Sequence, residues 1–164
     1  MGKDRLRGAW FILGCISVKS CNNEIMNASA TAIRSAAPIV GHIARQDLLH
    51  LYRGGRPDYK RIADFAKLSK ADLGKLAGVA KSSVRYDANI PEPVAERLRE
   101  IANIANLIAE FFAGDAEKVG LWFELPNPVL GNISPRQMIR IGRYKRLLNF
   151  VVDAREAESA TAAR

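Results

Sequence analysis

The sequence of 164 residues has few of the side chains that support disulfide, metal and nucleophile chemistry. It contains two cysteines, Cys15 and Cys21, and two histidines, His42 and His50. Two cysteines cannot build a disulfide framework, and this set offers too few ligands for a structural zinc site. Residues 91–164 contain neither cysteine nor histidine, so no Ser-His-Asp or Cys-His arrangement can be assembled there. We therefore expect no enzyme activity, no cofactor and no bound metal.

Long hydrophobic runs are also missing. The longest, Ala9 to Val18, is far shorter than the roughly 20 residues that a membrane-spanning helix needs. Three basic residues precede it, as in a signal peptide, but the polar segment 19–24 offers no small-residue cleavage pattern. We expect a cytoplasmic protein that does not associate with a membrane. Translation from Met1 and translation from Met26 both stay open.

Acidic residues are scarce in the first half of the chain. The net charge is +8, and all of this excess lies in residues 1–90, because residues 91–164 hold equal numbers of basic and acidic side chains. A basic half suits nucleic acid or an anionic membrane surface, and it also keeps a small protein in solution. Charge alone does not choose between these roles. An enzyme or a membrane-surface protein that uses the basic half is the most remote alternative.

What is present is mostly helical patterning. Apolar residues from Ile39 to Arg53 have helical spacing, and the breaker Gly-Gly-Arg-Pro follows at 54–57. Helices are then expected to begin after four capping residues, with a proline-containing linker before residue 94 and a frayed tail from Ala157 to Arg164. No strand is evident, so the fold class is all-α. The four expected caps are Asp58, Ser69, Asp115 and Ser134.

The segment Leu73–Tyr86 reads Leu-Gly-Lys-Leu-Ala-Gly-Val-Ala-Lys-Ser-Ser-Val-Arg-Tyr and resembles the helix-turn-helix of Xre/Cro-type repressors. Ala77 is small enough for two helices to approach, Gly78 suits the turn, and a short helix from about residue 81 would face the major groove. A plain three-helix bundle with a basic face is the alternative. The expected DNA-binding residues are Lys70, Lys75, Lys81, Ser82, Ser83, Arg85 and Tyr86, with Arg56 and Arg61 gripping the backbone.

A second motif lies in the neutral half. Residues 122–135 read Trp-Phe-Glu-Leu-Pro-Asn-Pro-Val-Leu-Gly-Asn-Ile-Ser-Pro and continue to Gly-Arg-Tyr at 142–144. This run resembles the toxin-binding domain shared by MbcA/ParS/Xre antitoxins. Asn132 stands where relatives often repeat glycine, and asparagine tolerates positive φ well. We expect Trp122 and Phe123 to be core residues, and Asn127 and Pro128 to shape the turn.

The resemblance covers roughly residues 55–155 and implies an antitoxin of a type II toxin–antitoxin system, of the RES–Xre class. Such a protein represses its own operon as a homodimer bound to operator DNA. It also blocks the active site of a cognate toxin, most often a RES-domain toxin that consumes NAD. A stand-alone repressor without a toxin is the alternative, and an adjacent toxin gene would separate the two. The resemblance places the blocking element at Asn149, Asp153, Arg155, Glu156 and Arg164.

The expected organisation has three parts. Residues 1–38 form a flexible or poorly defined extension, 39–90 a helix-turn-helix DNA-binding region, and 91–164 a helical toxin-binding and dimerisation domain with its C-terminal tail. Within the last part, Leu147, Leu148 and Val151 either pack internally or form a dimer seam. The operator sequence, the identity of the toxin and the stoichiometry of the complex are not encoded in these patterns.

Overall fold

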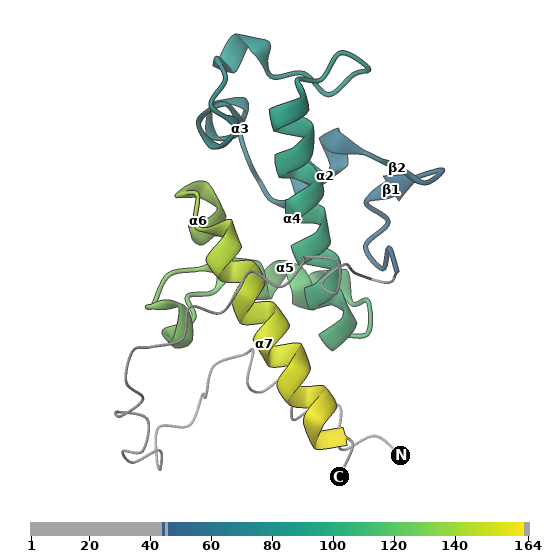
Figure 1. Ribbon diagram of the computed structural model, residues 1–164, viewed down its shortest axis with the longest axis vertical. Helices are drawn as coiled ribbons and strands as arrows, with labels where there is room; N and C mark the ends of the chain where they lie inside the picture. The colour runs from purple at the N-terminus through teal and green to yellow at the C-terminus, as the bar shows by residue number, and fades with distance from the viewer. Residues whose placement is uncertain (1–43, 45, 163–164) are drawn as a thin grey trace, which may run out of the picture.

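The computed structural model describes residue 44 and residues 46–162, and this part of the protein is mostly helical (Figure 1). The all-α prediction is confirmed. The predicted extension at residues 1–38 lies outside the described residues, as do Cys15, Cys21, His42 and Arg164. Within these residues the α-helices are α2 (Tyr59–Phe65), α3 (Lys70–Ala77), α4 (Glu92–Phe111), α5 (Ala116–Glu124), α6 (Pro135–Arg140) and α7 (Tyr144–Ala162).

Helix α4 is the axis of the fold. It packs against α2, α3, α5 and α7 (Figure 1). Its apolar residues recur every three or four positions, which buries a broad stripe from Val94 to Ala109. The buried residues form one continuous hydrophobic cluster that reaches from Leu49 to Ala154 on α7. Helices α3 and α7 are therefore held by one common core.

The aromatic residues of α5 lie inside this core. Trp122 is 3% exposed and Phe123 is 1% exposed, which confirms the prediction for both. The Phe123 ring makes edge-to-face contacts with Phe65 of α2 and with Trp122, at centroid distances of 5.6 and 5.2 Å. On α7, Leu147 and Val151 are fully buried within this chain, so they pack internally and do not form a dimer seam.

The segment before the first strand corrects one prediction. Residues 46–53 were expected to be helical, but they run as turns and extended backbone across α4. The Asp47 carboxylate accepts hydrogen bonds from the backbone N–H groups of Leu51 and Tyr52, both at 2.8 Å. Asn106 of α4 accepts from the Leu49 N–H at 3.2 Å and donates to Asp47 at 3.2 Å. These bonds satisfy backbone N–H groups that would have been paired within a helix.

A short hairpin was also missed at this point. Strand β1 (Tyr52–Arg53) pairs antiparallel with β2 (Arg56–Pro57). The expected breaker does turn the chain, because Gly54 and Gly55 adopt φ values of 57° and 75°. Two consecutive residues at positive φ suit a tight two-residue hairpin turn, and glycine occupies both positions without strain.

All four predicted helix caps are confirmed. In each case the side-chain oxygen accepts a hydrogen bond from the backbone N–H three residues later, which satisfies one of the free donors at the helix start. The capping residues are Asp58, Ser69, Asp115 and Ser134.

The predicted fraying of the tail is wrong for the described residues. Helix α7 continues through Ala157 to Ala162. Near this end, Ala154 is buried and Arg155 makes an ion pair of 3.2 Å with Glu110 of α4. The contact ties this part of α7 to α4.

Candidate functional site

Both ends of α3 are fixed by local interactions. The Ser69 N–H donates to the Asp72 carboxylate at 3.0 Å, and the Asp72 N–H donates to the Ser69 hydroxyl at 3.1 Å. This reciprocal pair is a complete capping box. At the other end Gly78 adopts φ 68°, a left-handed conformation that glycine accepts without cost. The turn that follows α3 therefore leaves the helix in a defined direction.

The close approach in this turn lies at Gly74, whereas the sequence pattern had suggested Ala77. A Cβ atom on Gly74 would lie 2.8 Å from the backbone oxygen of Val79 and 3.4 Å from the backbone nitrogen of Lys81. The Val79 N–H also donates to the Gly74 oxygen at 2.9 Å. A glycine inside a helix costs roughly 1 kcal/mol of stability relative to alanine. A glycine at this helical position is therefore the sequence feature that indicates a close backbone contact.

The predicted second helix is reduced to a single 3-10 turn, η2 (Lys81–Ser83). Val84 follows in an extended conformation and is 1% exposed, because its side chain enters the core. The two serines favour turns over helix, and Asp87 then accepts from the Asn89 N–H to start another turn. The prediction of a groove-facing helix from residue 81 is therefore wrong, although Lys81, Ser82 and Ser83 are exposed.

The expected DNA-binding side chains are accessible on α3 and on the turn after it. Lys70, Lys75, Lys81, Ser82, Ser83 and Arg85 are all exposed. Tyr86 is half-buried, and the Lys70 ammonium lies 5.7 Å from the centre of its ring. Burial raises the pKa of the Tyr86 hydroxyl, so this group stays protonated at neutral pH and is able to donate a hydrogen bond.

The two arginines expected to flank this surface sit on separate elements. Arg61 is exposed on α2 and Arg56 is exposed in the hairpin. Neither makes an ion pair within the described part of the chain, whereas Arg53 on the opposite strand pairs with Asp58 at 3.5 Å. A role for each in gripping a phosphate backbone stays a prediction.

The Pro-Asn-Pro turn is built around one buried amide. Asn127 is 4% exposed, and its side chain accepts from the Val129 N–H at 2.9 Å. Its backbone N–H donates to the Ile133 oxygen at 3.2 Å, which closes the loop around η3 (Pro128–Leu130). Asn132 adopts φ 59°, as its place in the motif predicts. Asn127 thus shapes the turn.

An ion cluster missed by the sequence reasoning joins this region to α3. Glu124 at the end of α5 pairs with Lys67, in the turn before α3, and with Arg136 of α6 at 2.7 Å. Hydrogen bonds from Lys67 and Arg136 lower the pKa of Glu124 to about 2. The partners are 57 and 12 residues away from Glu124, and no local spacing reveals such a cluster.

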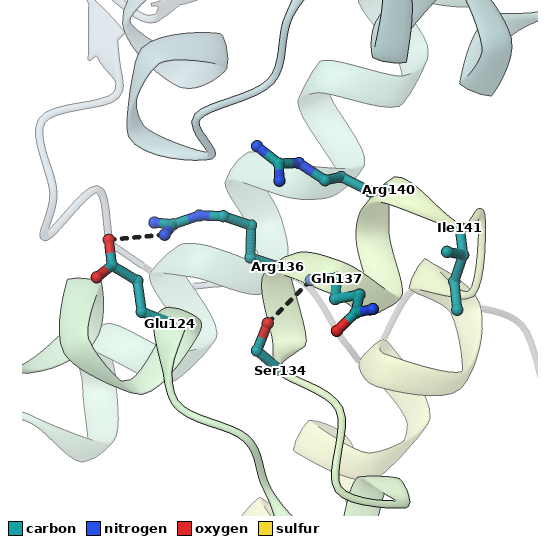
Figure 2. A pocket seen from close by; sticks show the side chains of 6 residues that line it. All are labelled: Glu124, Ser134, Arg136, Gln137, Arg140 and Ile141. Atoms are coloured by element: carbon teal, nitrogen blue, oxygen red, sulfur yellow. Dashed lines mark hydrogen bonds and ion pairs between the residues drawn. The ribbon is translucent and has the colours of Figure 1, made fainter.

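An open pocket of about 460 Å³ lies beside this cluster, as Figure 2 shows. Arg136 is 8% exposed and reaches toward Glu124, while Arg140 extends alongside it and donates to the Lys67 backbone oxygen at 2.8 Å. The pocket is lined by Glu124, Ser134, Arg136, Gln137, Arg140 and Ile141.

The expected toxin-binding residues divide into two kinds. Asn149, Asp153 and Glu156 are exposed at three- and four-residue spacing, so they share one face of α7. Arg155 is half-buried and bound to Glu110, which indicates that it anchors the helix. Arg164 lies outside the described residues.

Within the described residues, no cluster of three or more histidine, cysteine, aspartate or glutamate side chains is placed to hold a metal ion. No helix in this part of the chain is both long enough and apolar enough to cross a membrane.

No protein-family model matches the chain, and no curated protein sequence matches it. Among solved structures, the chain is similar to a chain in the crystal structure of the M. tuberculosis MbcT–MbcA toxin–antitoxin complex. The match has 24% sequence identity and a TM-score of 0.42, and it covers 61% of this chain and 92% of the other.

Proposed function

We propose that the protein is the antitoxin of a type II toxin–antitoxin module. It binds a cognate toxin and blocks its active site, and it binds operator DNA to repress its own operon. The toxin proposed is a RES-domain enzyme that consumes NAD, as the resemblance of residues 122–144 to MbcA/ParS/Xre antitoxins implies. The observation that carries the proposal is the folded Pro-Asn-Pro turn, whose buried Asn127 makes the hydrogen bonds that the motif needs as a structural unit.

The placement of the two surfaces supports this division of labour. In Figure 1, α3 and the turn after it lie at one end of the molecule, and the last turns of α7 lie at the other. The exposed face of α7 is basic at Lys145 and Arg146 and polar to acidic at Asn149, Asp153 and Glu156. A toxin bound at the acidic end would leave α3 free for DNA. Repression and neutralisation are then compatible within one complex, with a homodimer reading paired half-sites.

The toxin part is tested by reversing charge on the outer face of α7. We expect D153K/E156K to fold normally, because both side chains are exposed and make no described ion pair. It should lose co-purification with the product of the adjacent gene and fail to restore growth when that gene is expressed. The matched control E96K/E117K makes the same charge change on exposed residues of α4 and α5 and should neutralise as the wild type does.

Full neutralisation by D153K/E156K would remove this face of α7 from the proposal. A neighbouring gene product that neither binds the wild type nor harms the cell would favour the stand-alone repressor instead.

A further inference from the structure

The neutral charge of residues 91–164 conceals a strong segregation. Between Glu124 and Asp153 there is no acidic residue, but there are five basic ones. Four of these are exposed where α6 turns into α7, and we name this surface the α6–α7 corner: Arg140, Arg143, Lys145 and Arg146. The acidic residues that balance them lie on α4, on α5 and toward the end of α7.

The α6–α7 corner lies directly against α3. Gly142 is so close to Leu76 of α3 that a Cβ atom on it would lie 3.9 Å from the leucine side chain. Arg140 donates to the Lys67 oxygen in the turn before α3. Its charge also contributes to lowering the pKa of Asp72, after the larger effect of the Ser69 hydroxyl. The corner therefore lies beside α3, and the charges of Arg140 and Lys75 both act on Asp72.

The internal structure of the protein does not account for these charges. The side chains of Arg143 and Arg146 make no hydrogen bond or ion pair within the described part of the chain. Burial raises the pKa of Glu100, and the charge of the nearby Lys145 opposes this only in small part. Cations in the first turn of a helix oppose its dipole, so Lys145 and Arg146 weaken α7 slightly. Arg143 and Arg146 have no such internal partner, and they are suited to an external polyanion.

We propose that the α6–α7 corner is a second contact surface for duplex DNA and binds the phosphate backbone beside α3 and η2. This inference rests on the operator-binding part of the proposed function. A group of exposed cations beside α3, which itself carries the exposed Lys75, matches the closely spaced charges of a duplex. The core of a protein interface is depleted of charged residues, whereas four of the seven residues from Arg140 to Arg146 are charged.

The corner carries contacts that position the protein but do not read sequence. Arginine and lysine bound to phosphate oxygens fix the orientation of a protein on the duplex, whereas base edges supply specificity. Losing the corner should therefore weaken binding to every duplex by a similar factor. Losing a base-reading residue on η2 would instead affect only the preferred sequence.

The test is a salt titration with the full-length variant R143Q/R146Q. The two probes are a duplex from the region upstream of the gene and a mixed-sequence duplex of the same length. Each phosphate contact contributes about 0.9 to the slope of log affinity against log salt, so the slope should fall by about 1.8. Affinity at 0.1 M salt should fall by about tenfold or more on both probes. The control K118Q removes an exposed cation from α5 and should change affinity less than threefold.

The outcomes separate this inference from the function on which it rests. A wild-type slope and affinity for R143Q/R146Q, with normal binding by the wild type, would overturn the inference and leave operator binding intact. A variant that still binds both duplexes but no longer binds the toxin would also overturn the inference, since the corner would then be a protein interface. A wild type that binds neither duplex would refute operator binding and this surface together. Unchanged thermal unfolding of the variant shows that any loss does not come from misfolding.

Discussion

The substitution Gly74→Ala tests how the turn after α3 is held. Alanine is preferred over glycine in a helix interior by about 0.8–1.0 kcal/mol, so the substitution alone would stabilise α3. In this structure the added Cβ would lie 2.8 Å from the Val79 oxygen, a contact with backbone that no side-chain rotation relieves. Forcing extra atoms into a packed site costs typically 1–3 kcal/mol. The steric cost exceeds the helix gain, and we expect Gly74→Ala to be neutral to destabilising by up to about 2 kcal/mol.

Gly120→Ala is the matched control, because Gly120 lies inside α5 and a Cβ there meets nothing within 4 Å. It should stabilise the protein by up to about 1 kcal/mol. The free energies of unfolding of both variants, measured by urea titration with equal m-values, should differ by about 1–3 kcal/mol. Because the turn carries Lys81, Gly74→Ala should also weaken DNA binding. Equal stabilisation by the two substitutions would refute the packing of Val79 on Gly74.

Three further predictions concern separate sites. Asn106→Ala should lower the free energy of unfolding by about 2–4 kcal/mol, because the buried Leu49 N–H and Asp47 each lose a hydrogen-bond partner. Asn149→Ala, on an exposed face, should change the free energy of unfolding by less than about 0.5 kcal/mol. Equal effects of the two substitutions would refute the role of Asn106. Glu124→Gln should reduce the loss of stability between pH 4.5 and 2. A carboxylate with a lowered pKa stabilises the fold above its unfolded pKa, and this stabilisation is lost as the group protonates. Thermal unfolding of both proteins across this pH range measures the difference, and parallel stability profiles would contradict the prediction. Arg85→Ala should relax base preference at one position by about 1–3 kcal/mol in a binding-site selection, and an unchanged preference would remove Arg85 from base readout.

Local features of this fold could be predicted from the sequence. Ser69 and Asp115 cap their helices through bonds to N–H groups three residues away, so their spacing alone reveals them. Gly78 and Asn132 adopt positive φ because the residue type is suited to it. In the same way, the buried positions of α4 follow from its apolar repeat.

Features that depend on distant partners could not be predicted. The helical spacing up to Leu51 gave a wrong prediction of helix, because Asn106, more than 50 residues later, binds this segment in an extended form. The second helix after Gly78 is shortened because Val84 enters the core, a constraint that only the packed structure imposes. The Glu124 cluster needs Lys67 and Arg136 to meet across three elements. The basic α6–α7 corner was hidden because the charge was averaged over a longer stretch.

The most direct measurement of the proposed function is NAD consumption by the purified product of the adjacent gene, titrated with this protein. The proposal predicts a stable complex and a fall in NAD consumption that reaches completion at a fixed molar ratio, with D153K/E156K leaving the toxin active. Undiminished NAD consumption in an excess of the wild-type protein would contradict the proposal that it neutralises such a toxin.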